Sequence, residues 1–186
     1  MPAERRVLVI PGRSMGPFAP QLLFPAFAAL RRGAELTPIE WAETKTVDEL
    51  DASGIASWVA DQTASAIDAL DPKSGVIVGK SLGTYAAAVV ADRSLPAIWV
   101  TPLLTNEFVR HALSRSAAPF LLVGGTADPF WDGAVARKLT PHVLELPEAD
   151  HGLFLPGPLE LSAQNIGRLA SASEQFLDEA VWPTAR

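Results

Sequence analysis

Short apolar runs alternate along the chain with longer stretches whose apolar residues recur at helical spacing. Each short run is rich in Val, Ile and Leu and ends at a Pro, Gly, Thr or polar residue, which is typical of strands buried on both faces. The predicted strands are RVLVI (6–10), ELTPI (35–39), GVIVG (75–79), AIWV (97–100), FLLVG (120–124) and HVLEL (142–146). Because Pro38 cannot donate a ladder hydrogen bond, we expect its strand at a sheet edge.

The intervening stretches predict six helices. They cover roughly 18–32, 53–70, 82–92, 105–115, 131–138 and 159–179. Strict alternation of strand and helix predicts a three-layer α/β/α sandwich, in which a doubly wound, mostly parallel six-stranded sheet carries helices on both faces. No internal repeat or linker divides the chain, so we expect residues 1–186 to form a single domain.

Composition and charge narrow the classes of partner. The chain is 48% apolar and 19% charged, which fits a globular domain and not a disordered one. A net charge of −6 without a Lys/Arg run argues against nucleic acid and membranes as partners. The apolar N-terminal stretch ends at Pro11, too early for a signal peptide, and no run approaches a membrane span, so we expect a soluble, cytoplasmic protein. The absence of cysteine excludes thiolate chemistry, and no cofactor or metal is expected.

The stretch SGVIVGKSLGTY (74–85) matches two motifs with different functions. Its GKS resembles the end of a phosphate-binding P-loop, whereas GKSLG matches G-x-S-x-G, the turn that presents a nucleophilic serine. A P-loop requires Gly where Ser74 stands and an irregular backbone where VIV predicts a strand. The serine turn requires a strand before Ser81 and a helix directly after it, and both are predicted. We therefore interpret Ser81 as a nucleophile, with Gly79 and Gly83 allowing strand and helix to approach closely.

A second G-x-S-x-G, at Gly12 to Gly16, follows the first predicted strand. Ser14 is the poorer candidate because Pro17 and Pro20 interrupt the helix that should start there. The first strand also has no earlier strand that could donate an oxyanion-hole N–H.

A serine hydroxyl needs an adjacent base to become a good nucleophile. Three histidines are present. His111 lies in a predicted helix and His142 opens a strand, so structural roles are favoured for both. His151 follows the last strand, at the carboxyl end of the sheet where open α/β sheets build their sites. We interpret His151 as the base.

The base needs a carboxylate to orient it, and three aspartates in the last third of the chain are candidates. Asp128 follows the penultimate strand and is the preferred candidate. Asp132 is better explained as a charge at a helix N-terminus. Asp150 adjoins His151 and is expected to point away from it, although adjacency in sequence does not exclude Asp150 as the orienting carboxylate.

The order Ser81, Asp128, His151 is that of the α/β hydrolases. The chain resembles this superfamily in four segments spanning nearly its whole length, VLVIPGRSMG, VGKSLGT, VGGTADPFWD and EADHGLF. The resemblance implies a small α/β-hydrolase fold without an inserted cap domain and without the two leading strands of the family. It also implies that Ser81 is the nucleophile, that His151 is general base and later acid, and that Asp128 orients it.

The resemblance further implies an oxyanion hole of backbone N–H groups. Leu82 would donate one, and Arg13 or Ser14 would donate the other. Where the family often has His-Gly, this chain has Pro11-Gly12, a departure that bears on the second donor and not on the triad.

The segment after the strand 97–100 is too short to hold a cap, so we expect a shallow, open pocket. Its candidate apolar walls are Leu103, Leu104, Phe108, Phe130, Trp131 and Phe154; ordinary packing beneath loops is an equal alternative for each. Lys80 and Arg13 flank the site. They would attract an anionic substrate group, although a solvated cation or a salt bridge is the favoured explanation.

The expected function is cleavage of a small carboxylic ester or thioester through an acyl-enzyme, with a small acyl molecule as partner. The same residues are compatible with a lactonase, a peptidase or an acyltransferase, and with any oligomeric state. A catalytically silent hydrolase fold that binds a partner is the alternative.

Overall fold

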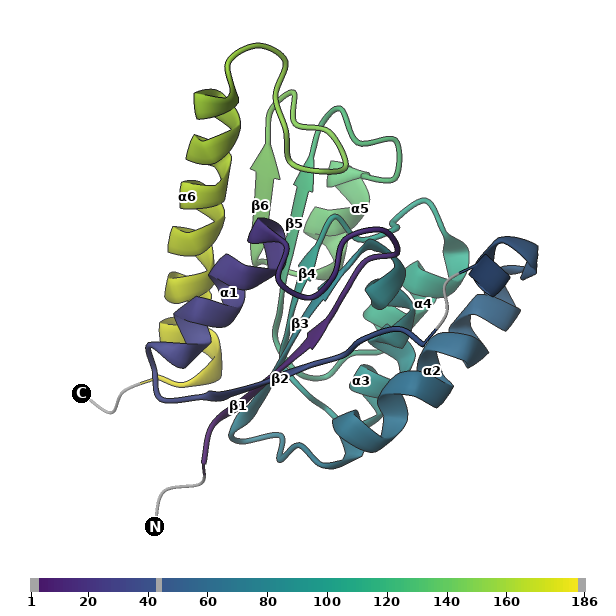
Figure 1. The fold of residues 1–186 in the computed structure, drawn as a ribbon. Helices are drawn as coiled ribbons and strands as arrows, with labels where there is room; N and C mark the ends of the chain where they lie inside the picture. The colour runs from purple at the N-terminus through teal and green to yellow at the C-terminus, as the bar shows by residue number, and fades with distance from the viewer. Residues whose placement is uncertain (1–3, 43–44, 184–186) are drawn as a thin grey trace.

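The computed structural model describes residues 4–42 and 45–183, which form a three-layer sandwich around a parallel sheet (Figure 1). The sheet has six strands in the order β2-β1-β3-β4-β5-β6, and each neighbouring pair is parallel. The strands are β1 (Arg6–Ile10), β2 (Glu35–Pro38), β3 (Gly75–Lys80), β4 (Ala97–Val100), β5 (Phe120–Gly125) and β6 (Val143–Leu146). The strand that contains Pro38 lies at the edge, as the missing donor predicts.

Helices cover both faces of the sheet. The α-helices are α1 (Pro20–Leu30), α2 (Ala52–Asp68), α3 (Ala87–Asp92), α4 (Glu107–Ser114), α5 (Gly133–Leu139) and α6 (Leu159–Phe176). Helices α1 and α6 lie side by side on one face, and the other four contribute to the opposite layer (Figure 1). Helix α1 begins at Pro20, because the fixed φ of proline suits the first helical position.

Three shorter segments complete the chain. Two are 3₁₀ turns, η1 (Lys45–Glu49) and η2 (Ser81–Ala86), and one is a π turn, η3 (Leu177–Val181). The stretch predicted as one helix over 82–92 is thus a 3₁₀ turn followed by α3. No helix among the described residues is both long enough and apolar enough to cross a bilayer.

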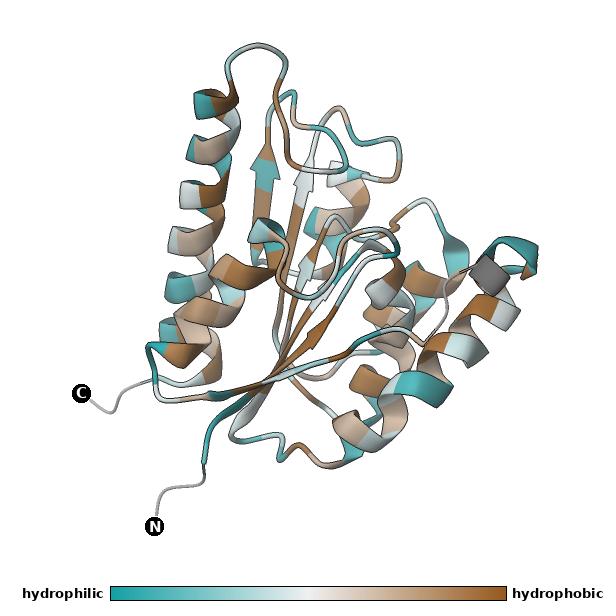
Figure 2. Cartoon of the chain, in the orientation of Figure 1, coloured by the Kyte–Doolittle hydropathy of each residue, from teal (hydrophilic) through white to brown (hydrophobic). Residues whose placement is uncertain are grey.

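The core consists of two apolar layers, one on each face of the sheet. On β3, Val76 and Val78 belong to the layer beneath α1 and α6, whereas Ile77 belongs to the layer beneath α2, α3 and α4. Figure 2 shows apolar residues concentrated on the central strands and on the helix surfaces that cover them. Because all six residues of β3 are buried, this strand holds its carboxyl end, and the residue after it, in a rigid position.

Candidate active site

Ser81 occupies a sharp turn between β3 and η2. Its φ of 49° lies in the left-handed region that a residue with a side chain rarely adopts. Two glycines make the turn possible. A Cβ on Gly79 would overlap the indole ring of Trp99, and a Cβ on Gly83 would lie 2.5 Å from the Ile10 carbonyl oxygen. The turn therefore lifts Ser81 out of the sheet at its carboxyl end.

His151 joins Ser81 to Asp128 in a row of hydrogen bonds. Its Nε2 lies 2.8 Å from Ser81 Oγ, and its Nδ1 lies 2.7 Å from Asp128 Oδ2. Asp128 is buried, and its second oxygen accepts a hydrogen bond from the Phe130 N–H at 2.9 Å. Because an ionised carboxylate can only accept, Nδ1 carries the proton, which leaves Nε2 free to accept the Ser81 proton.

The rival carboxylates and histidines serve the fold. Asp132 caps the N-terminus of α5 by accepting from two backbone N–H groups, each at 2.9 Å. Asp150 shapes the loop after β6 by accepting from the backbone N–H of two residues that follow it, at 2.7 and 2.9 Å. His111 is exposed on α4, and His142 packs edge-on against Phe176 with ring centres 5.2 Å apart.

Lys80 is buried beside the nucleophile, with only 5% of its surface exposed. Its Nζ donates to Thr101 Oγ1 at 2.9 Å and to the His151 carbonyl oxygen at 3.0 Å. Burial lowers the pKa of Lys80 from 10.5 to about 8, against the opposing effect of the carboxylates of Asp128 and Asp150. The expectation of a solvated or ion-paired cation is wrong for Lys80, which instead fastens the His151 loop to the serine turn.

Arg13 forms an ion pair with Asp48 at the surface, in agreement with the favoured explanation of its charge. The backbone of the same loop faces the site, because a Cβ on Gly12 would lie 3.5 Å from Ser81 Cβ.

Trp41 fixes the orientation of that loop. Its indole Nε1–H donates to the Gly12 carbonyl oxygen at 3.1 Å. Trp41 follows β2 and Ser81 follows β3, and these strands flank β1 on opposite sides. In a planar trans peptide the carbonyl and the next N–H point in opposite directions, so we infer that the Arg13 N–H is directed toward Ser81. Among the described residues, neither this amide nor that of Leu82 bonds a backbone carbonyl of a turn, loop or cap.

Four of the six expected pocket walls pack beneath the loops. Leu104 is fully buried, and Leu103, Phe108 and Trp131 are half-buried against the core layer that contains it. Phe108 stacks on Tyr85 with ring centres 6.0 Å apart. The short connection from β4 to α4 thus turns its apolar side chains toward the sheet, which corrects the expectation that Leu104 lines an open pocket.

The remaining two expected walls lie beside the histidine. Phe130 packs edge-on against the His151 ring, with ring centres 5.1 Å apart, and is partly exposed. Phe154 follows His151 in the same loop and is also partly exposed. Their role as substrate contacts stays a prediction.

A hollow with a volume of about 180 Å³ lies over the serine. Its walls are the loop 12–15, Lys80, Ser81, His151 and Gly152. Within the described part of the chain, no group of three or more His, Asp or Glu side chains is arranged to hold a metal ion. The polar side chains that line the hollow include the Ser81 hydroxyl, the His151 imidazole and the Lys80 amine.

No protein-family model matches the chain, and no curated protein matches its sequence. Solved structures match its fold. A dienelactone hydrolase from Anabaena variabilis superposes with a TM-score of 0.69 at 18% identity, over 97% of this chain and 88% of that chain. Est1E from Butyrivibrio proteoclasticus, solved with ferulic acid bound, gives 0.65 at 14% identity, over 95% and 89% of the two chains.

A further match is an α/β serine hydrolase without a lid from Xanthomonas campestris. It gives a TM-score of 0.54 at 14% identity and covers 100% of this chain and 88% of that chain. The chain therefore has the α/β-hydrolase fold, with a parallel six-stranded sheet and helices on both faces.

Proposed function

We propose that the chain is a serine hydrolase that cleaves a small carboxylic ester or thioester through an acyl-enzyme on Ser81. The observation that carries the proposal is the hydrogen-bonded row of Ser81, His151 and Asp128, with atom separations of 2.8 and 2.7 Å. The left-handed φ of Ser81 adds support, because the turn that presents a nucleophilic serine after a strand is strained in this way. The fold is also that of an Anabaena enzyme described as a dienelactone hydrolase.

The first half of the reaction forms the acyl-enzyme. Ser81 Oγ attacks the carbonyl carbon while His151 Nε2 takes the hydroxyl proton, and the carbonyl electron pair moves onto oxygen. The oxyanion is stabilised by the backbone N–H groups of Leu82 and Arg13. His151 then returns the proton to the leaving alcohol or thiol as its bond to carbon breaks.

The second half regenerates the enzyme. A water molecule loses a proton to His151 Nε2 as its oxygen attacks the acyl carbon, and the Ser81 oxygen leaves with that proton. Asp128 stays ionised throughout and stabilises the imidazolium that forms twice. The buried position of Asp128 strengthens this interaction, since little solvent screens it.

The test is removal of the nucleophile. Ser81→Ala should lower kcat for a short p-nitrophenyl ester by a factor on the order of 10⁴ or more. Ser171→Ala, at an exposed position of α6, is the matched control and should behave as wild type. Equal rates for wild type and a folded Ser81→Ala would show that Ser81 is not the nucleophile.

A fluorophosphonate probe separates the enzyme from a catalytically silent binding module. Labelling that maps to Ser81, and not to Ser14 of the second G-x-S-x-G, is the expected result. A folded protein that takes up no label would favour the binding module.

A further inference from the structure

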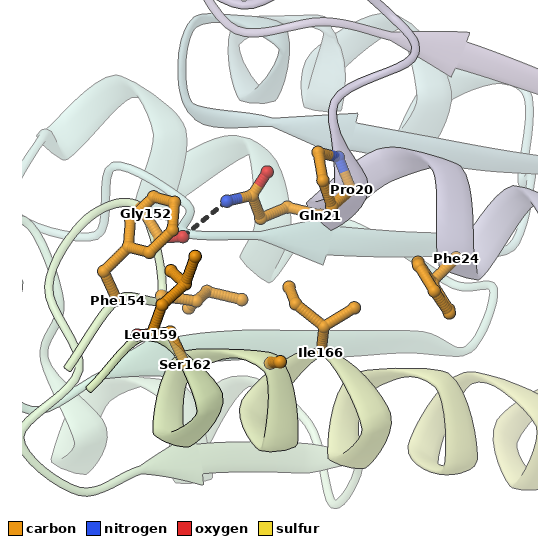
Figure 3. A pocket seen from close by; sticks show the side chains of 10 residues that line it. Pro20, Gln21, Phe24, Gly152, Phe154, Leu159, Ser162 and Ile166 are labelled. Carbon is orange, nitrogen blue, oxygen red and sulfur yellow. Dashed lines mark hydrogen bonds between the residues drawn. The ribbon is translucent and has the colours of Figure 1, made fainter.

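An apolar groove lies between α1 and α6 (Figure 3), next to the hollow over the serine. Pro20, Gln21 and Phe24 of α1 form one wall, Leu159, Ala163 and Ile166 of α6 form the other, and Gly152 to Phe154 close one end. We call it the α1–α6 groove. Its volume is about 370 Å³, about twice that of the serine hollow at 180 Å³.

The groove and the serine hollow are neighbours because Gly152 lines both. Sites for small molecules generally have volumes of roughly 300 to 1,000 Å³. The serine hollow alone, at about 180 Å³, is smaller than this. Together with the groove it reaches the usual size, so a substrate held at Ser81 has room to extend past Gly152.

Gln21 holds Gly152 in place at this junction. The Gln21 side chain is 1% exposed, and its Nε2 donates to the Gly152 carbonyl oxygen at 2.5 Å. Figure 3 shows this bond reaching from α1 to the loop after His151. A Cβ on Gly152 would lie 2.5 Å from the ring of Phe154, which lines the groove, so a side chain at this position would displace that ring. The junction is thus a built feature of the fold.

The chemistry of the groove selects an uncharged, apolar occupant. Of the described residues that line it, none is charged, and the Ser162 hydroxyl already accepts from the Leu155 N–H at 2.9 Å. The rim exposes Phe24, Phe154 and Leu159 by 42%, 43% and 73%. Large apolar side chains gathered at an exposed hollow are typical of a binding surface.

We propose that the α1–α6 groove binds an alkyl chain of the substrate, so that the substrate class is esters or thioesters of medium-length apolar chains. This inference rests on the proposed function of Ser81. Ala163 and Ile166 then determine which chain lengths are accepted, because both line the groove farther along α6 than Leu159. Figure 3 shows Leu159 near Gly152 and Ile166 farther from it.

The test compares p-nitrophenyl esters from acetate to octanoate. In wild type we expect kcat/KM to rise with chain length by up to about fourfold per methylene, the value of burying each CH₂ group. Ala163→Trp fills the groove and should reduce the octanoate-to-acetate ratio at least tenfold. Ser171→Trp places the same side chain at an exposed position of the same helix outside the groove and should keep the wild-type ratio. Ile166→Glu provides a second variant by introducing a charge.

The outcomes separate the groove from the catalytic proposal. Ser81-dependent hydrolysis with a flat chain-length profile, or an unchanged ratio in Ala163→Trp, would overturn the groove proposal and leave the serine hydrolase standing. If no ester is hydrolysed in a Ser81-dependent way, the proposed function fails, and calorimetric titration with uncharged 1-octanol decides the groove. Binding of 1-octanol that Ala163→Trp abolishes would retain the groove as a chain-binding site, and no binding would overturn it.

A second copy of the chain is the competing occupant. Sedimentation of the wild type as a dimer that Ala163→Trp converts to monomer would assign the groove to subunit contact and overturn the proposal. A monomeric wild type with the expected ester profile would support it.

Discussion

Lys80 occupies the variable position of G-x-S-x-G, where the motif makes no demand on the residue. Its Nζ donates to the His151 carbonyl oxygen and the Thr101 hydroxyl at 3.0 and 2.9 Å, so it joins the segment that carries the base to the segment that carries the nucleophile. Sequence placed this lysine beside the site but did not reveal that it is buried. A motif fixes the course of the backbone, whereas side-chain direction depends on residues far away in the chain.

Burial of Lys80 should make stability depend on pH. Between pH 8 and 10.5 the folded state holds Lys80 neutral while the unfolded state still binds a proton there. Because the unfolded state binds more protons, the free energy of unfolding should rise with pH across this window, by about 3 kcal/mol at most. Lys80→Met, which has no amine to titrate, should not show this rise in the free energy of unfolding. Urea unfolding of wild type and Lys80→Met at pH 7, 8, 9 and 10 measures the difference.

The two hydrogen bonds of Lys80 favour its charged form and reduce the rise below that ceiling. The other titratable groups contribute equally to the pH dependence of both proteins, so their contributions cancel in the difference between wild type and Lys80→Met. Parallel stability curves for the two proteins would show that Lys80 titrates at its ordinary pKa in the folded state.

At the scale of elements, the strands were predicted well and the helix starts less well. The strand over 75–79 was predicted one residue short of β3, and 97–100 matches β4. Strands buried on both faces are continuous apolar runs, so their limits are visible in sequence. The helix predicted over 82–92 begins instead as a 3₁₀ turn, because the tight packing of Gly83 against Ile10 is a tertiary constraint that periodicity does not record.

The loop after β1 depends on an element that sequence did not connect with it. Trp41 follows β2 and donates to the Gly12 carbonyl oxygen at 3.1 Å. The ring of Trp41 also packs on Trp58 of α2, with ring centres 5.1 Å apart. The edge strand and α2 together thus hold the loop that carries the Arg13 N–H.

Trp41→Phe tests this support. The variant keeps an aromatic ring beside Trp58 but loses the donor to Gly12, so the Arg13 N–H should be less well aligned with the oxyanion. Complete loss of one oxyanion donor costs roughly 10² to 10³ in kcat, and we expect a smaller loss, about tenfold, with little change in KM. Trp58→Phe, which alters the same ring pair without touching the loop, is the control. Equal kcat values for the two variants would contradict the assignment.

For the whole molecule, the parallel sheet explains why the candidate site was predictable. The carboxyl ends of parallel strands meet at one edge, so Ser81, Asp128 and His151, each following a predicted strand, were expected to converge there. Figure 1 shows the loops after β5 and β6 at the same end of the sheet as the β1 loop. The roles of the three residues stay a prediction, although their hydrogen bonds are in place.

The α1–α6 groove was not predicted, because its walls come from opposite ends of the chain. Of the expected pocket walls, only Phe154 lines it. Residues 20–24 and 159–166 have ordinary amphipathic patterns, and nothing local indicates that the two helices leave a gap. The packing of two helices against one face of the sheet, which creates the groove, is a property of the assembled fold.

Arg32 links α1 and the segment after α6 at the end of the helix pair away from the groove. This residue follows α1, and its Nε and Nη2 donate to the two carboxylate oxygens of Asp178 in η3 at 2.6 and 2.7 Å. The hydrogen bond from Arg32 is the main cause of a lowered pKa for Asp178. A bidentate pair holds both side chains in one geometry, so it fixes the α1 end relative to the end of α6.

Asp178→Asn should therefore destabilise the protein at neutral pH and change its acid response. A depressed folded-state pKa contributes stability at neutral pH that is lost as the pH falls below the ordinary value of 3.8. Because Asp178 is half-exposed, solvent limits the effect at pH 7 to about 0.2 to 1 kcal/mol. The stability difference between wild type and Asp178→Asn, measured by urea unfolding, should shrink as the pH falls below 3.8 and through the lowered folded-state pKa of Asp178. Asp68→Asn removes an ion pair with Arg93 between α2 and the end of α3, and it should leave the octanoate-to-acetate ratio unchanged. If Asp178→Asn lowers the octanoate-to-acetate ratio while Asp68→Asn does not, the ion pair at the far end of α1 and α6 controls the width of the groove. If neither variant lowers the ratio, the residues that line the groove determine its width by themselves.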